Sequence, residues 1–317
     1  MKTFKRIIAV ICYVIIFFII LYNLSNILMH KQIEGRWNMT AKVAGFFNEE
    51  PNTFDVIFFG SSHMYCSVDP NVFEEKTGLK SYVFATQRQP LWITYHYILE
   101  ALKTQSPEII VVETHMVIEE EDYMDEGTNH TAIDPIPFSK NKIEMIKAAV
   151  PKGERRYYIF NIMKYHERWE ELKETDYARE YETETDPYKG YVRLTTAAID
   201  IDRQDISKVK EAKQLTEKNR YYLNKIIDLA QQEGIFLILL KSPSNATVEE
   251  KMYYNAVSEI AKQRGVEYID YNDEELYKEV GLDIETDFYD QRHLNESGMV
   301  KFVSHFGDYL LECYVEK

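Results

Sequence analysis

Two short segments near opposite ends of the chain together contain a serine, an aspartate and a histidine. Residues 59–63 read Phe-Gly-Ser-Ser-His, and residues 290–295 read Asp-Gln-Arg-His-Leu-Asn. A serine hydroxyl becomes a nucleophile when a histidine accepts its proton and a carboxylate orients the imidazole and stabilises its cationic form. The two segments therefore predict acyl chemistry through a covalent intermediate on Ser62, with His293 as the base and Asp290 as its partner.

The first segment follows residues 54–59, a run of β-branched and aromatic side chains that is typical of a strand buried in a parallel sheet. Gly60 is expected to end this strand, because glycine lets the backbone turn sharply. Open α/β sheets bind their ligands at the carboxyl ends of the strands, so this turn displays Ser62. The structural alternative is that Ser62 only caps the following helix, since serine is a favoured N-cap.

The second segment places Asp290 and His293 three residues apart, and one short turn can present both side chains in the same direction. The same spacing also suits a simple ion pair in a loop. Residues 294–311 then predict a closing amphipathic helix.

With these two blocks, the sequence resembles the SGNH/GDSL hydrolase superfamily, and within it a membrane-anchored bacterial branch that acts on cell-surface polymers. In that superfamily the first block is Gly-Asp-Ser or Gly-Ser-Ser with the last serine as nucleophile, which matches residues 60–62. The last block is Asp-x-x-His, often continued by Leu-Asn and a glycine, which matches residues 290–295 and Gly298. The resemblance implies a serine esterase or O-acyltransferase that uses neither a metal nor a cofactor.

The two middle blocks of the superfamily, which supply oxyanion donors, differ here. The second block supplies a glycine amide, whereas residues 84–90 contain no glycine, so the backbone at Arg88 or Gln89 is the expected donor. The third block supplies an asparagine, but residues 108–112 run into Glu-Thr-His, which ends at His115. Arg88, Gln89 and His115 are therefore the candidates for oxyanion or substrate binding. Because losing one such donor can cost about 10²–10³-fold in rate, the substitutions predict a slow enzyme, a different donor set or no enzyme.

Strands alternate with helices along the domain. This pattern predicts a three-layer α/β/α fold with a mainly parallel five-stranded sheet, SGNH-like and flavodoxin-like. The predicted strands are residues 54–59, 80–84, 108–112, 235–240 and 266–271. The predicted helices are residues 70–77, 91–103, 208–232 and 248–264.

The alternation breaks over about residues 116–202, which contain Pro135, Pro137 and Pro151 and then a charged, tyrosine-rich stretch. A loop of this length without its own structure is uncommon. We therefore expect helical insertions over the sheet, acting as a lid or as a subdomain specific for a substrate or partner.

Before the domain lies an almost wholly apolar run, residues 7–29, which is slightly longer than the roughly 20 residues needed to cross a bilayer. Lys2, Lys5 and Arg6 precede it, so the positive-inside rule places residues 1–30 as a cytoplasmic end and transmembrane anchor. Residues 31–317 are then an extracytoplasmic domain of a single-pass cell-membrane protein. The alternative is a cleaved signal peptide, whose apolar core is usually about 7–15 residues long.

Composition excludes some partners. The formal net charge of -15 argues against a nucleic-acid partner, and against a highly anionic polymer unless basic groups gather at the cleft. The acidic residues 119–122 lack fixed ligand spacing and are expected to form a solvated turn, not a metal site. Outside the apolar run, Cys66 and Cys313 either pair or remain separate buried thiols.

Other residues have both a functional and a structural interpretation. His63 and the loop 241–245 lie where they can face the cleft, but they also suit a first helical turn and a strand-to-helix connection. The aromatic residues Trp92, Tyr95 and Tyr97 can stack on sugar rings, although such residues on a helix against a sheet are more often core.

The predicted function is a membrane-anchored serine acyltransferase or esterase that adds or removes O-acyl groups on a cell-surface polysaccharide, with acetyl as the expected group. The resemblance also implies a membrane-bound O-acyltransferase as a partner that exports the acyl group. Two alternatives stay open: an inactive SGNH-like scaffold that binds polymer or such a partner, and D-alanyl transfer to teichoic acid.

Overall fold

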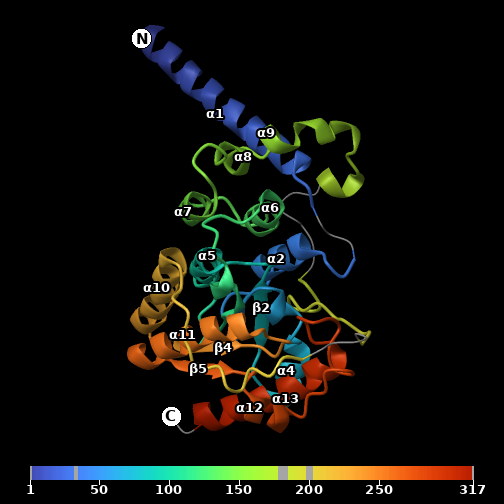
Figure 1. Cartoon of the computed structure of the whole chain (residues 1–317). Coiled ribbons are helices and arrows are strands. Elements are labelled where there is room, and N and C mark those ends of the chain that lie inside the picture. Colours follow the sequence, from blue (N-terminus) through green and yellow to red (C-terminus); the bar gives the residue numbers. More distant parts are fainter. Residues whose placement is uncertain (1, 32–34, 178–184, 198–202, 316–317) are drawn as a thin grey trace.

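The computed structural model describes residues 2–31, 35–177, 185–197 and 203–315, and its centre is a parallel sheet (Figure 1). The strands lie in the order β2-β1-β3-β4-β5 and every pair is parallel. Their bounds are β1 Val56–Gly60, β2 Ser81–Ala85, β3 Ile109–Glu113, β4 Phe236–Lys241 and β5 Glu267–Asp270. All five predicted strands are present, most of them displaced by one residue toward the C-terminus.

Side chains alternate between the two faces of the sheet, and each face has its own apolar core. Ile57 and Phe59 of β1 point into one core, and Val56 and Phe58 point into the other. Both sets are fully buried, as expected for a parallel sheet that is covered on both sides. The period of two therefore explains how one continuous apolar run serves two cores.

Helices cover both faces, which confirms the predicted three-layer α/β/α architecture. The helices α2 (Met39–Phe47), α5 (Leu91–Ala101), α10 (Glu217–Glu233) and α11 (Val248–Arg264) bury apolar residues in the first core. The helices α4 (Pro70–Thr77), α12 (Glu274–Val280) and α13 (Glu296–Val315) do so in the second core.

The predicted helix 208–232 is wrong at its start, because α10 begins at Glu217. Thr216 is its N-cap, and the Thr216 side chain accepts a hydrogen bond from the backbone N–H of Asn219. The helices α2 and α12 were not predicted, since both are short and are held by tertiary packing more than by their own sequence pattern.

Residues 115–177 form a series of short helices, so the expected helical insertion is present. They are η1 (His115–Ile118), α6 (Glu126–Ile133), α7 (Lys140–Ala149), α8 (Arg156–Ile159), α9 (Ile162–Tyr165), η2 (His166–Glu170) and η3 (Glu174–Tyr177). The helices α6 and α7 pack on α2 and α5, while α8 and α9 continue toward α1 (Lys2–Leu28) (Figure 1). The predicted end of the insertion, at residue 202, lies outside the described residues.

The N-terminal helix α1 projects away from the domain (Figure 1). Among the described residues it is the one helix that is long and apolar enough to cross a membrane, with a mean hydropathy of 2.8 over its most apolar window. A signal sequence shares these properties, so a retained anchor remains a prediction.

The C-terminal end of α1 docks on the insertion through polar contacts. The guanidinium of Arg168 donates to the backbone oxygens of Leu28 and Met29, at 2.6 and 2.8 Å. The backbone N–H of Ile162 donates to Oγ of Ser25 at 3.2 Å. The Arg168 guanidinium satisfies carbonyls that a helix end leaves unpaired, and it places a positive charge at the negative end of the helix dipole.

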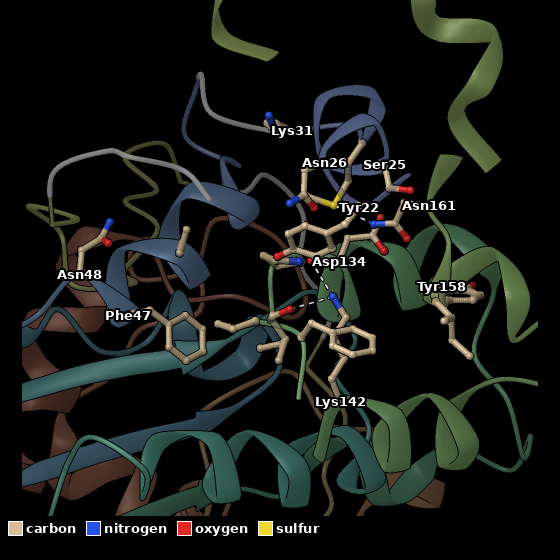
Figure 2. Close-up of a pocket in the computed structure, with 17 residues that line it drawn as sticks. Tyr22, Ser25, Asn26, Lys31, Phe47, Asn48, Asp134, Lys142, Tyr158 and Asn161 are labelled. Carbon is tan, nitrogen blue, oxygen red and sulfur yellow. Dashed lines mark hydrogen bonds between the residues drawn. The ribbon is translucent and has the colours of Figure 1, made fainter. Parts of the chain in front are cut away.

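A cavity of about 190 Å³ lies at this junction (Figure 2). Its residues come from the end of α1, from α2 and from the insertion, among them Tyr22, Phe47 and Asn161. Lys142 is buried there and donates to the backbone oxygens of Asp134 and Ile136, at 3.1 and 2.7 Å. Burial lowers the pKa of Lys142 to about 8.

Candidate active site

The turn after β1 depends on a glycine. Gly60 has φ +150°, and a Cβ placed there would lie 2.7 Å from Cβ of Glu113 on the neighbouring strand β3. A side chain at this position would be strained and would also collide, so only glycine lets the chain leave β1 this close to β3. The next residues enter the short helix α3 (Ser62–Tyr65).

Ser61, and not Ser62, is the N-cap of α3. The Ser61 side chain accepts from the backbone N–H of His63 at 3.4 Å and donates to Oε2 of Glu113 at 3.4 Å. Ser62 is the first helical residue, and its hydroxyl bonds elsewhere. The alternative interpretation of Ser62 as a helix cap is therefore wrong.

The structure brings Ser62, His293 and Asp290 together in one chain of hydrogen bonds. Oγ of Ser62 lies 2.8 Å from Nε2 of His293, and Nδ1 of His293 lies 2.9 Å from both carboxylate oxygens of Asp290. With Nδ1–H donating to the carboxylate, Nε2 is left as an acceptor for the serine proton. This is the geometry that a serine nucleophile with its base and orienting carboxylate requires.

The carboxylate of Asp290 is held in its charged form. Burial by itself raises its pKa, but the hydrogen bond and charge of His293, with the backbone N–H groups of Arg292 and His293, outweigh burial and lower the pKa overall. Those two N–H groups donate to Oδ1 at 2.7 and 2.9 Å. The short turn that presents the pair thus also fixes the orientation of the carboxylate.

The residues after His293 fasten this turn to the domain. Leu294 forms an antiparallel bridge with Phe288, and the side-chain amide of Asn295 donates to the backbone oxygen of Thr286 at 2.7 Å. Gly298 lies so close to the backbone oxygen of Asp287 that a Cβ would collide with it. The Leu-Asn and glycine that continue the block therefore have a structural role, which is to hold Asp290 and His293 in place.

Ser62 opens into a cleft of about 360 Å³. Its apolar wall comes from Trp37, Tyr65, Met116 and Ile118. Its polar groups include His63, His115, His293, Arg88 and Arg292. Among the described residues of the insertion, those that line the cleft lie before residue 120. The helices α6 to α9 therefore do not form a lid over it, and a role as a subdomain for a substrate or partner stays a prediction.

The candidates from the second block lie in different surroundings. Arg88 lines the cleft, adopts a left-handed backbone with φ +48°, and forms ion pairs with Glu119 and Asp125 at 3.2 and 3.0 Å. It therefore has the backbone conformation that favours glycine. Gln89 does not line the cleft, since its side chain is buried and bonds to Thr86 and Thr94.

His115, the third candidate, lies on the floor of the cleft together with His63. The two imidazole rings stack with centroids 3.7 Å apart, and Nδ1 of His115 lies 2.9 Å from the hydroxyl of Tyr254. Burial, followed by the charge of Lys241 and of the other histidines, lowers the pKa of both rings well below the usual value. Both rings are therefore neutral near pH 7.

Beneath the histidines lies an ion pair without exposed surface. Nζ of Lys241, at the end of β4, is 3.2 Å from Oε1 of Glu113, at the end of β3. Burial raises the pKa of Glu113 and lowers that of Lys241, in spite of their mutual attraction. Lys241 also lies 3.3 Å from Nδ1 of His63, which links the pair to the cleft.

The remaining sequence candidates are structural. Trp92 and Tyr97 are fully buried in the first core, as the core interpretation held, and neither lines the cleft. Of the acidic run, Glu119 pairs with Arg88, and Glu120 pairs with Lys213. The cysteines Cys12, Cys66 and Cys313 are all free, which resolves the question of a disulfide.

Comparison with known proteins gave no matching family model and no matching curated protein. One similar solved structure is a protein assigned to the lipolytic G-D-S-L family from Desulfitobacterium hafniense DCB-2. It has 10% identity and a TM-score of 0.41, over 81% of this chain and 98% of that one. Another is a protein described as an acylhydrolase from Bacteroides fragilis NCTC 9343, with 11% identity and a TM-score of 0.39, over 83% of this chain and 91% of that one.

This chain combines a turn that carries Ser62 after β1, the strand order β2-β1-β3-β4-β5 and an Asp-x-x-His turn before the last helix. The fold is flavodoxin-like. The predicted three-layer α/β/α fold is confirmed, whereas the resemblance to the SGNH/GDSL hydrolase superfamily and to its membrane-anchored branch stays a prediction. Both TM-scores lie below 0.5, so the two similarities say nothing about the chemistry of this chain.

Sequence reasoning missed three features of this site. Arg292 lines the cleft, although it lies inside the block that was singled out. Lys241 was considered only as a loop residue, whereas it is fully buried as the last residue of β4. Trp37 lies before the first strand, where no motif marks it. A lysine that ends an apolar strand was the one available signal, because such a charge needs a buried partner.

Proposed function

We propose that the SGNH-like domain is a serine esterase or O-acyltransferase with Ser62 as its nucleophile. The observation that carries the proposal is the 2.8 Å contact between Oγ of Ser62 and Nε2 of His293, continued by the 2.9 Å contacts to Asp290. Hydrogen bonds orient all three groups, and the cleft gives a substrate access to Ser62.

The reaction proceeds in two halves. Oγ of Ser62 attacks the acyl carbonyl carbon while His293 takes the serine proton, and Asp290 stabilises the imidazolium. The leaving alkoxide then departs with the proton from His293, which leaves an acyl-enzyme. Water or a sugar hydroxyl, deprotonated by His293, attacks that ester and releases the acid or the acylated acceptor.

The charges around the cleft support a neutral, hydroxyl-rich substrate. Arg88 is paired with Glu119 and Asp125, and Arg292 is paired with Glu250. Neither arginine is therefore available to pair with the phosphates of a phosphate-rich polymer, and the whole protein carries a net charge of -15. These observations favour O-acetyl groups on a cell-surface polysaccharide over D-alanyl transfer to teichoic acid.

Docking of α1 supports a retained anchor with an extracytoplasmic domain. Ser25 and Leu28 at the end of α1 are buried, and Arg168 binds the last carbonyls of the helix, so these residues are part of the folded protein. The basic residues Lys2, Lys5 and Arg6 favour a cytoplasmic N-terminus. A protein in this place can receive acyl groups from a membrane-bound O-acyltransferase, which is the partner we propose.

A test uses the full-length protein in detergent and a fluorophosphonate that reacts with activated serines. Peptide mapping is expected to show the adduct on Ser62, and none in a His293→Ala variant that retains wild-type thermal stability. An absence of adduct on folded wild-type protein would contradict the enzyme proposal and favour the inactive scaffold.

Hydrolysis and transfer are separated by their products. With p-nitrophenyl acetate as donor, acetate release alone indicates an esterase. If a neutral oligosaccharide raises nitrophenol release and appears acetylated by mass spectrometry, the protein is a transferase. The same assay with glycerol phosphate oligomers tests the D-alanylation alternative, for which we expect no acceptor activity.

A further inference from the structure

The amine of Lys241 has three close partners beneath the nucleophile turn. Nζ lies 3.2 Å from Oε1 of Glu113, 2.7 Å from the backbone oxygen of Ser242 and 3.3 Å from Nδ1 of His63. Oγ of Ser242, at 3.5 Å, is the most distant contact. The Lys241 and Glu113 side chains have no exposed surface, so water does not complete this set.

These partners determine where the hydrogens of Lys241 point. A net charge in a fully buried site is costly, so Glu113 and Lys241 share one proton. The Ser242 carbonyl only accepts, and it takes one N–H. If the shared proton is on Lys241, another N–H remains for His63. If the shared proton is on Glu113, the carboxyl O–H donates to the lone pair of the Lys241 amine, and an N–H of Lys241 again remains for His63. Nδ1 of His63 is an acceptor in both cases.

A neutral imidazole whose Nδ1 accepts carries its proton on Nε2. The ring of His63 is neutral near pH 7, because burial and then the neighbouring charges lower its pKa. The ring is also held in place, since it stacks on His115, which in turn bonds to Tyr254. The structure therefore fixes both the tautomer and the orientation of His63.

Nε2 of His63 is open to the cleft beside the nucleophile. His63 lines the cleft, and its ring centroid lies 5.4 Å from that of His293, whose Nε2 contacts Ser62. Within the described part of the chain, Nε2 of His63 has no hydrogen-bond partner, yet it is not a fully enclosed atom as Nε2 of His130 is. The Nε2–H of His63 is therefore a donor of fixed direction that is available to an acceptor atom of the substrate.

We propose that the Nε2–H of His63 is an oxyanion donor for the acyl group on Ser62, and that Glu113 and Lys241 are positioning residues that fix this tautomer. The inference rests on the serine chemistry proposed above. As Oγ of Ser62 bonds to the carbonyl carbon and its proton passes to His293, the C=O π electrons move to the oxygen, which accepts from His63. Collapse reforms the C=O bond and expels the alkoxide, which takes the proton from His293.

This donor accounts for the altered third block. SGNH/GDSL hydrolases have an asparagine donor after the third strand, whereas β3 here ends at Glu113 and is followed by Thr114 and His115. Glu113 holds the amine that sets the tautomer, and His115 supports the ring by stacking. The substituted block still provides an oxyanion donor, but it does so through His63.

The tautomer is measurable without any activity. Full-length protein labelled with ¹⁵N-histidine, in detergent at pH 7.5, is expected to give the two-bond ¹H–¹⁵N pattern of an Nε2–H tautomer for His63. A His63→Gln spectrum assigns the signal. An Nδ1–H tautomer or an imidazolium would overturn the inference, whether or not Ser62 is reactive.

Kinetics test the catalytic role with a matched pair of variants. His63→Phe keeps a ring against His115 but has no donor, and we expect its fluorophosphonate labelling rate to fall about 10²–10³-fold. His63→Gln restores an N–H near the position of Nε2, and we expect its labelling rate to be at least tenfold higher than that of His63→Phe. Both variants are compared at equal thermal stability.

The outcomes separate the two proposals. If wild-type protein is not labelled, the serine chemistry is contradicted. The tautomer measurement does not depend on labelling and still tests the predicted Nε2–H tautomer of His63. Labelled wild-type protein with an unchanged His63→Phe rate leaves the serine chemistry intact and overturns His63 as the donor.

Discussion

Ser62 and His293 are 231 positions apart in the sequence, and their Oγ and Nε2 atoms lie 2.8 Å apart in the structure. The contact depends on two turns that are built separately. One leaves β1 through Gly60, and the other is fastened by Leu294 and Asn295. Each turn is set by local sequence, whereas the distance between them is set by the packing of α13 against the sheet.

Replacement of the nucleophile tests the role of this contact. Ser62→Ala is expected to abolish fluorophosphonate labelling and to lower esterase turnover by about 10⁶-fold. Ser207→Ala is the matched control, because Ser207 is exposed and, among the described residues, its side chain bonds to Asp205 alone. Wild-type turnover by Ser62→Ala protein would remove Ser62 from the mechanism.

Loss of the Asp290 charge should affect rate and acid stability differently. Asp290→Asn is expected to lower turnover by about 10⁴-fold, since the amide cannot stabilise the imidazolium. The folded-state pKa of Asp290 is below its usual value, so this group stabilises the fold above about pH 4, and the contribution disappears as pH falls through the folded-state pKa. The stability difference between wild type and variant should therefore shrink below pH 4 in urea titrations. The difference should be small, because 44% of the Asp290 side chain is exposed.

The buried pair should behave as a unit in a double-mutant cycle. Lys241→Met or Glu113→Leu alone leaves one buried charge unpaired, and each is expected to lower the free energy of unfolding by about 3–5 kcal/mol. The double variant should lose much less than the sum. Additive losses in urea denaturation would show that the two side chains do not interact.

The glycine that ends β1 should be irreplaceable. Gly60→Ala combines a strained φ with a collision against Glu113, and we expect a loss of about 1–3 kcal/mol from strain alone. Gly153→Ala is the control, because a Cβ there meets nothing within 4 Å and φ is not positive. Equal stabilities of the two variants would refute the explanation of the turn.

Arg168 should couple α1 to the insertion. Arg168→Gln removes the donors to Leu28 and Met29, so hydrogen exchange in α9 and η2 is expected to accelerate while labelling of Ser62 is retained. Arg156→Gln serves as the control, because Arg156 is exposed and, within the described part of the chain, its guanidinium bonds to Tyr157 and not to α1. Unchanged exchange in the Arg168 variant would show that other contacts hold the helix.

The strand pattern and the two end blocks were predictable because both are local. Residues 56–59 are an uninterrupted apolar run, and the Asp-x-x-His spacing needs one turn only. The α/β/α layers follow from the alternation of strands and helices, and the structure confirms them.

The floor of the cleft was not predictable, because it is made by contacts between strands that are distant in sequence. Lys241 is informative only once β4 lies beside β3 and brings it to Glu113. The stacking of His63 on His115 likewise requires the register of β1 against β3. The target of the insertion was missed for the same reason, since nothing in the sequence of α9, η2 and η3 indicates that these helices dock on α1.

The hydrogen bonds from Arg168 to the last turn of α1 have a consequence for how a long polymer would be modified. If α1 spans the bilayer, this contact holds Ser62 at a constant distance from the membrane, unlike the active site of an enzyme on a flexible tether. Acyl groups would then be added to the polymer at one distance from the lipid surface. Their spacing along the polymer would depend on how fast the growing polymer passes Ser62. A flexible spacer inserted after Met29 should broaden that interval, and an unchanged acylation pattern would show that height plays no part.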